Sequence, residues 1–246
     1  MAPYATASDR AREHGLRAPN SALRVFEARA VLEFSSLFAA APLLASQPRG
    51  DGRRVVVMPG FGADDASTWP LRQYLNALGY RAYGWGIGRN SGDPEGDAIR
   101  VGERVAELHA QDEPVTLIGW SLGGVVARLI ARNQTHQVRE VITLGTPVEG
   151  GPKYTSVGSI FAASKGIDLD QFEHHVHRIN SEGLSTPLTV IYSRSDAIVG
   201  WQAAIDRYNA HARHVEVPSS HIGLGVNPIV WRVIARTLGQ KSKEAA

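Results

Sequence analysis

The chain has 246 residues, of which 43% are hydrophobic and 20% charged, and its formal net charge is only +2. This length fits one soluble domain with a sizeable core, so residues 1–246 are treated as a single domain. The small net charge and the absence of a long basic run argue against a nucleic-acid partner. Because the sequence has no cysteine, disulfides, thiolate metal sites and a cysteine nucleophile are excluded.

Residues 1–50 predict a helical extension ahead of the main body. Residues 22–46 form the most membrane-like stretch, but charged residues interrupt it, so it falls short of a membrane-spanning helix. Its apolar residues recur at helical spacing and form a broad face. Two interpretations remain open, a helix docked on its own domain and a weak membrane-surface anchor. The N-terminus lacks the pattern of a secretory leader, so we expect a cytoplasmic protein.

From residue 55 onward, apolar runs typical of buried strands alternate with helical patterns. The strands are predicted at 55–58, 81–87, 114–120, 138–147, 187–196 and 214–218. The helices are predicted at 69–78, 97–111, 122–134 and 227–239, the last with Pro228 near its start and Gly239 at its end. This alternation predicts an α/β fold with a mostly parallel sheet between layers of helices. Residues 148–186 break the alternation and predict a small cap or lid.

The stretch GWSLGG at 119–124 connects a predicted strand to a predicted helix. A serine between glycines at such a turn has the nucleophile-elbow pattern Gly-x-Ser-x-Gly, in which a strained turn holds the hydroxyl clear of the backbone. The turn also places Ser121 at a helix N-terminus, where developing negative charge is favoured. The alternative is a glycine-rich helix start with an inert serine. We predict that Ser121 is a nucleophile.

A serine hydroxyl needs a base, and the base needs an orienting carboxylate. Asp196 follows one predicted strand, and His221 lies between the last strand and the last helix. Both therefore fall at carboxyl ends of strands, the edge where α/β sites form, and in the chain order usual for this architecture. Taken singly, Asp196 could be a turn residue and His221 a capping or packing residue. Asp168 and Asp170 are weaker candidates because they lie in the irregular stretch.

Acyl transfer also needs donors for an oxyanion. The backbone N–H of Leu122, directly after the serine, is one candidate, and the N–H of Phe61 in the loop 59–62 is the other. The alternative for that loop is an ordinary strand-ending turn. Several tryptophans fall in or beside the loops that border the site and suggest an apolar acyl or alcohol pocket, namely Trp69, Trp85, Trp120 and Trp201.

Two other kinds of site are less favoured. Residues 173–177 read EHHVH, but without a second ligand cluster this run is interpreted as a solvated or cap-facing segment, and no metal is expected. The sequence has no GxxxxGK[ST] stretch, so a P-loop nucleotide site is not expected.

These motifs resemble the α/β-hydrolase superfamily, and within it the bacterial lipase and esterase branch. The matching stretches, in family order, are VVVMPGFG, GWSLGG, LGTP, YSRSDAIV and SSHIGLGVNP. The resemblance covers residues 55–239 and implies a Ser121–Asp196–His221 triad, an oxyanion hole from Phe61 and Leu122, and no cofactor. Haloalkane dehalogenases and epoxide hydrolases differ by an aspartate at the elbow. Many lipases also have His-Gly where this chain has Pro-Gly at 59–60.

The sequence therefore predicts a serine hydrolase that cleaves carboxylic esters or lipid esters through an acyl-enzyme. The same residues would serve an acyltransferase, a thioesterase or an amidase. A binding protein that kept the fold and lost the reaction is a third interpretation, against which the three intact residues argue. The natural substrate, its acyl-chain length and the oligomeric state stay open.

Overall fold

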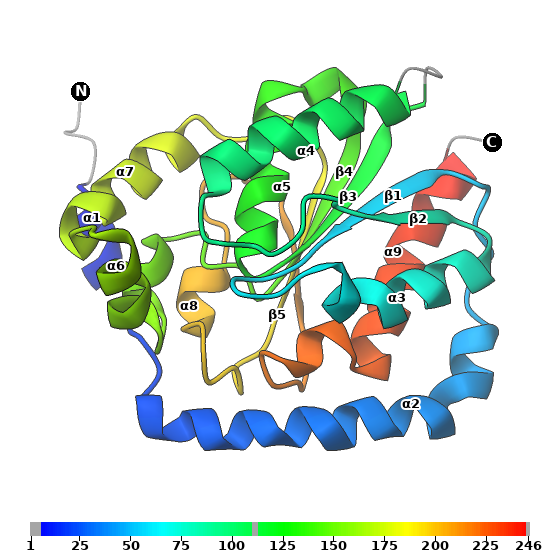
Figure 1. The fold of residues 1–246 in the computed structure, drawn as a ribbon, viewed down its shortest axis with the longest axis horizontal. Coiled ribbons are helices and arrows are strands. Elements are labelled where there is room, and N and C mark those ends of the chain that lie inside the picture. The colour runs from blue at the N-terminus through cyan, green and yellow to red at the C-terminus, as the bar shows by residue number, and fades with distance from the viewer. Residues whose placement is uncertain (1–5, 110–112, 245–246) are drawn as a thin grey trace.

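A computed structural model describes residues 6–109 and 113–244 (Figure 1). In these residues six parallel strands form one sheet in the order β2-β1-β3-β4-β5-β6. The strands are β1 (Arg54–Met58), β2 (Arg81–Gly84), β3 (Val115–Trp120), β4 (Val138–Leu144), β5 (Leu188–Tyr192) and β6 (Arg213–Glu216). The predicted α/β class with a parallel central sheet is confirmed.

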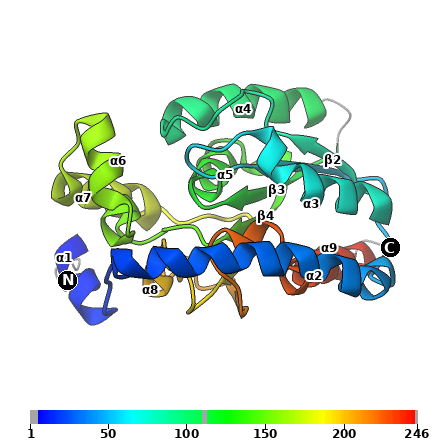
Figure 2. The same cartoon turned by 60° about the horizontal axis from the view of Figure 1, so that its bottom comes forward.

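Helices cover both faces of the sheet (Figures 1 and 2). One layer contains α3 (Asp65–Leu78) and α9 (Pro228–Glu244), and the other contains α4 (Pro94–His109) and α5 (Leu122–Asn133). Alternate residues of a strand point to opposite faces, so Val55 and Val57 enter one core while Val56 and Met58 enter the other. The first turns of α5 stand at the carboxyl edge of the sheet, where the predicted site residues gather.

The N-terminal residues form α1 (Ala7–Glu13) and a long helical rod made of the 3-10 helix η1 (Ser21–Arg29) and α2 (Ala30–Ala45). The rod runs along one side of the domain past α8 (Trp201–Ala204) and α9 (Figure 2). Most of its large apolar side chains face outward, namely Leu23, Val25, Phe26, Val31, Leu32, Phe34, Phe38 and Leu43. The rod is therefore docked on its own domain mainly through the opposite face.

Residues between β4 and β5 form a small helical group beside the carboxyl edge of the sheet (Figure 1). It comprises the 3-10 helix η3 (Gly151–Tyr154), α6 (Gly158–Lys165) and α7 (Leu169–Ser181). The remaining 3-10 turns are η2 (Thr135–Gln137) and η4 (Gly223–Gly225). We refer to η3, α6 and α7 together as the cap.

Several element boundaries differ from the sequence prediction, and two of these differences have a clear physical cause. Strand β2 ends at Gly84, because the carboxylate of Asp65 accepts the N–H groups of Trp85 and Gly86 at 2.9 and 3.0 Å and turns the chain out of the sheet. Helix α9 continues past Gly239. That glycine instead lies against Pro48, where a Cβ would collide with the proline ring.

Candidate active site

Ser121 adopts a backbone conformation that L-residues rarely tolerate. Its φ is +54° and its ψ is −121°, and in the described part of the chain no other residue except glycine has positive φ. The Ser121 N–H donates to the Leu144 carbonyl at 2.8 Å, and the Thr146 hydroxyl donates to the Ser121 carbonyl at 2.9 Å. The end of β4 and the loop after it therefore hold the turn in place. Strain that the surroundings enforce in this way gathers at functional sites.

The glycines around Ser121 are required by close backbone packing. A Cβ on Gly119 would collide with Gly124, and a Cβ on Gly124 would collide with the Thr146 side chain. A Cβ on Gly123 would lie 2.5 Å from the Met58 carbonyl oxygen. Each glycine of GWSLGG therefore lets β1, β3, β4 and α5 meet closely beneath the serine.

Asp196 and His221 form a buried ion pair. The Oδ2 atom of Asp196 lies 2.6 Å from Nδ1 of His221, and both side chains are buried. The other oxygen, Oδ1, accepts the backbone N–H groups of Ile198 and Val199 at 2.8 and 2.7 Å. Burial lowers the pKa of His221, but the charge and hydrogen bond of Asp196, together with the charge of Glu27, raise that pKa above its ordinary value.

The His221 loop is fixed next to the serine turn. The Trp120 indole N–H donates to the His221 carbonyl at 3.1 Å. The ion pair also packs on Gly145, whose φ is +57° and whose Cβ would lie 3.1 Å from both Asp196 Oδ2 and His221 Nδ1. Within the described residues the Ser121 hydroxyl does not hydrogen-bond to His221. Catalytic hydrogen bonds are often long before substrate binds and tighten in the complex.

The two candidate oxyanion donors lie on either side of this turn. Within the part of the chain that the structure describes, the backbone N–H groups of Phe61 and Leu122 donate to no protein acceptor. The loop before Phe61 touches the serine, since a Cβ on Gly60 would lie 3.2 Å from the Ser121 Cβ. Asn90 secures this loop: its amide donates to the Pro59 carbonyl at 2.9 Å. Sequence analysis missed Asn90, which carries no motif.

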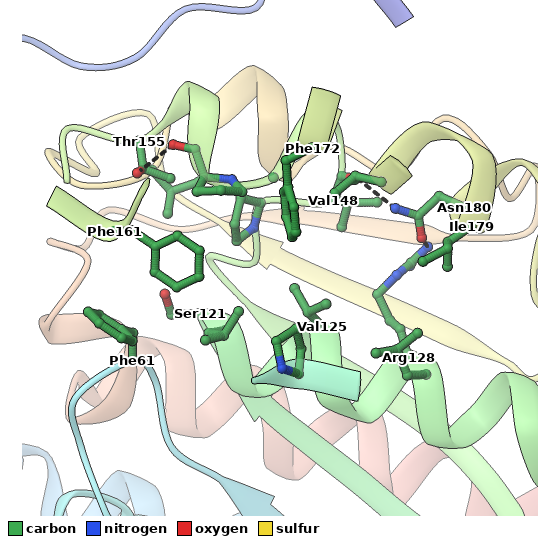
Figure 3. A pocket seen from close by; sticks show the side chains of 18 of the residues that line it. Phe61, Ser121, Val125, Arg128, Val148, Thr155, Phe161, Phe172, Ile179 and Asn180 are labelled. Carbon is green, nitrogen blue, oxygen red and sulfur yellow. Dashed lines mark hydrogen bonds between the residues drawn. The ribbon is translucent and has the colours of Figure 1, made fainter. Parts of the chain in front are cut away.

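A pocket opens directly from Ser121 between α5 and the cap (Figure 3). The space not filled by protein atoms is about 930 Å³, with the open mouth of the pocket included. The rings of Phe61 and Phe161 meet edge to face with centroids 5.2 Å apart beside the serine. Most of its lining is apolar, including Val125, Leu129, Val148, Phe172, Val176 and Ile179.

The predicted tryptophan lining is wrong, because the pocket walls come from α5 and the cap. Trp85 is wholly buried in the core, and Trp69 is 56% exposed on α3. Trp201 stacks on Tyr192 outside the pocket, at a centroid distance of 6.2 Å. Trp120 is not among the residues that line the pocket, and its indole holds the His221 loop.

The histidine-rich run of α7 is occupied by contacts within the protein. His175 Nε2 lies 2.7 Å from Glu95 Oε1, and His177 Nδ1 lies 3.0 Å from the Tyr208 hydroxyl. Across the described residues, His, Asp and Glu side chains form no group of three that could hold a metal ion. Asp168 caps the N-terminus of α7, and the carboxylate that contacts His221 is that of Asp196.

Glu27 is a buried carboxylate on η1 that sequence analysis did not single out. Its Oε1 accepts the N–H groups of Ala197 and His221 at 2.9 and 3.1 Å, and its Oε2 accepts the N–H of Ile222 at 2.8 Å. It therefore joins the loop that carries Asp196 to the loop that carries His221. Its side chain is among the few of the rod that are buried.

Glu33 on α2 makes similar contacts with the residues just before His221 in the same loop. It accepts the Ser220 N–H at 2.9 Å, the Ser219 hydroxyl at 2.6 Å and the Asn227 amide at 2.9 Å. Neither oxygen touches His221. Glu33 is thus a natural comparison for Glu27, because both carboxylates attach the rod to this loop.

We expect Glu27→Gln to lower kcat by about tenfold or more, because small displacements of a catalytic group are costly. The NH2 group of the glutamine cannot accept the backbone N–H groups that the Glu27 carboxylate accepts, so the His221 loop loses alignment. Removal of the Glu27 charge also lowers the pKa of His221, so the acid limb of kcat/KM against pH moves to lower pH. Glu33→Gln is the matched control and leaves that limb in place. Equal pH profiles for the two variants would contradict a role for Glu27 in positioning His221.

Residues 55–238 match the model of a family described as "Alpha/beta hydrolase family". Pimeloyl-[acyl-carrier protein] methyl ester esterase of Aliivibrio salmonicida (strain LFI1238) is 31% identical over 126 residues, which cover 49% of this chain and 42% of that protein. The matched part is thus less than half of that relative.

Two solved lipases share the fold at low sequence identity. Bacillus licheniformis lipase BlEst2 in mature form has a TM-score of 0.60 at 15% identity, with 78% of this chain and 94% of that chain covered. Aspergillus fumigatus lipase B has a TM-score of 0.57 at 15% identity, with 77% of this chain and 54% of that chain covered. With the family model matching most of its length, the chain belongs to the alpha/beta hydrolase family.

Proposed function

We propose that this protein is a serine hydrolase that cleaves carboxylic esters. The observation that carries the proposal is the strained Ser121 at the head of α5, opening into an apolar pocket. The buried Asp196–His221 pair beside the same turn supports it. The esterase and lipase relatives support the substrate class.

In the proposed reaction the Ser121 oxygen attacks the ester carbonyl carbon while His221 Nε2 takes its proton. The carbonyl oxygen becomes an oxyanion that accepts the N–H groups of Phe61 and Leu122. As the carbon–oxygen bond to the alcohol breaks, His221 returns the proton to the alcohol. Water then attacks the acyl-enzyme, gives a proton to His221, and releases the acid with Ser121 restored.

The test is reaction with a fluorophosphonate probe together with hydrolysis of p-nitrophenyl esters from acetate to palmitate. Labelling at Ser121 and release of p-nitrophenol are expected. A wild-type protein that is folded yet neither labelled nor active would favour the non-catalytic interpretation. An acyltransferase, a thioesterase and an amidase would use the same three residues, so substrates must distinguish them. Transfer to an added alcohol would indicate an acyltransferase, cleavage of thioesters a thioesterase, and cleavage of amides an amidase.

We also propose that the outer face of the rod rests on anionic lipid surfaces. The segment Ser21–Ala45 is long and apolar enough to cross a membrane by composition, with a hydropathy of 1.4, but only 11% of that window is buried. Its two carboxylates, Glu27 and Glu33, face the catalytic loops. Every exposed charged side chain in residues 16–50 is basic, namely Arg17, Arg24 and Arg49. An apolar face bordered by arginines suits an interfacial helix better than a spanning one.

This proposal predicts co-sedimentation with vesicles of phosphatidylcholine and phosphatidylglycerol, weaker with phosphatidylcholine alone. Replacement of Phe26, Phe34 and Phe38 by serine lowers the partition coefficient by at least about tenfold, since burying one such ring contributes about 1.5–3 kcal/mol. Ile99→Ser, an exposed apolar residue on α4, is the matched control and binds like wild type. Recovery of the wild type in the supernatant at all compositions contradicts the proposal. A concentration-dependent dimer that the triple substitution abolishes would instead assign the face to a second copy.

A further inference from the structure

The pocket has a charged end opposite the nucleophile. Its lining follows one face of α5 from Ser121 through Val125 and Arg128 to Arg132. Figure 3 shows Ser121 and Arg128 at opposite ends with Val125 between them. Because a helix rises about 1.5 Å per residue, Ser121 and Arg132 are separated by about 16 Å along the axis of α5. An acyl chain bound to Ser121 would therefore extend along the apolar walls toward the arginines.

The two arginines at this end differ in their partners. Both terminal nitrogens of Arg128 have partners: one forms an ion pair with the buried Asp206, and the other donates to the Asn180 side chain at 3.1 Å, while Nε makes no hydrogen bond among the described residues. These contacts fix α5 against α7. Arg128 is therefore part of the framework at this end of the pocket.

Arg132 has no comparable partner among the described residues. Its Nε and both terminal nitrogens are buried and make no hydrogen bond there. It forms an ion pair with Glu182, whose Oε2 lies 3.7 Å from Arg132 Nε, but the Glu182 side chain is 67% exposed, so solvent screens the attraction. The charge of Asp206, which pairs with Arg128, also acts on Arg132. Burial, and then the neighbouring Arg128 charge, lower the pKa of Arg132. A buried guanidinium with unused donors is costly unless an anion satisfies it.

From this arrangement we infer that Arg132 binds a carboxylate at the far end of the acyl chain, so that the enzyme prefers monoesters of dicarboxylic acids. This inference rests on the proposed ester hydrolysis at Ser121. The apolar walls hold the methylene chain, and the planar guanidinium matches a terminal carboxylate in a two-point hydrogen bond. The number of methylene groups that fits between Ser121 and Arg132 then determines which substrate is preferred.

The test compares monomethyl esters of dicarboxylic acids, from succinate to sebacate, with methyl esters of monocarboxylic acids of equal carbon number. The wild type is expected to favour the charged ester by about tenfold to hundredfold in kcat/KM at its best chain length. Arg132→Gln lowers kcat/KM for the charged ester far more than for the neutral ester and so removes this preference, whereas Arg132→Lys keeps part of it. Glu182→Gln raises the preference, because it removes the competing carboxylate.

Equal turnover of charged and neutral esters by the wild type would overturn the inference, as would an Arg132→Gln variant that keeps the preference. A binding measurement separates this inference from the proposed function. Calorimetry of monomethyl suberate on Ser121→Ala, with and without Arg132→Gln, is expected to show at least a tenfold weaker Kd when the arginine is absent. If no ester is hydrolysed, the proposed function fails, while this comparison still decides whether Arg132 binds the carboxylate.

Discussion

Ser121→Ala is expected to lower kcat for ester hydrolysis by several orders of magnitude, up to about 10⁶-fold, with KM little changed. The substitution removes the nucleophilic oxygen and leaves both backbone donors and the pocket in place. Fluorophosphonate labelling disappears in the same variant. Ser67→Ala, which removes a hydroxyl from α3 that bonds only within its own helix turn, is the matched control and keeps wild-type kinetics. Activity near wild type in Ser121→Ala would remove Ser121 from the mechanism.

The backbone of the elbow supplies a second readout for the same residue. A φ of +54° with a ψ of −121° is strained for serine and alanine but not for glycine. Ser121→Gly is therefore expected to be as inactive as Ser121→Ala and more stable, by the order of 1 kcal/mol in the free energy of unfolding. Thermal unfolding of the two variants measures the difference. A less stable glycine variant would mean that the surroundings do not enforce the strain.

Local sequence patterns were sufficient for the fold and for the residues at the strand ends. The alternation of strands and helices and the turn at Ser121 depend on residues that are close in sequence. Asp196 and His221 could be predicted to meet because parallel strands end at one edge of a sheet. The catalytic role of these three residues stays a prediction until the variants are measured.

The remaining parts of the site depend on contacts between distant segments. Glu27 reaches the His221 N–H across 194 positions of sequence, and no local pattern marks it. The tryptophans near the loops were misplaced because proximity in sequence does not say which face of an element a side chain occupies. One wall of the pocket comes from the irregular stretch between β4 and β5, whose helical packing on α5 the sequence pattern did not reveal.

Asp196→Asn is expected to lower kcat by about 10⁴-fold while the fold is kept. The asparagine carbonyl can still accept the N–H groups of Ile198 and Val199, so the turn after β5 survives. Its amide, however, donates toward His221 Nδ1 and favours the tautomer that cannot accept the Ser121 proton. Asp168→Asn is the matched control: asparagine caps a helix as well as aspartate does, so α7 and the kinetics are unchanged.

The direction in which wild-type kcat/KM changes with pH also tests the Asp196–His221 pair. Neutral His221 is the base, and its pKa is raised above the ordinary value, so kcat/KM falls on the acid side as pH drops through that raised pKa. In Asp196→Asn burial prevails over the remaining Glu27 charge, and the acid limb moves to lower pH.

The free energy of unfolding depends on pH in the opposite sense to the activity, because the folded protein favours protonated His221. The contribution of the pair is complete below the unfolded pKa of about 6.5 and is lost as pH rises through the folded value. Denaturant unfolding of the wild type and of Asp196→Asn, measured on both sides of this window, isolates that contribution as a difference that shrinks with rising pH. A difference that grows with pH would show that His221 is held neutral in the folded protein, and the proposed orientation of His221 by a charged Asp196 would have to be abandoned.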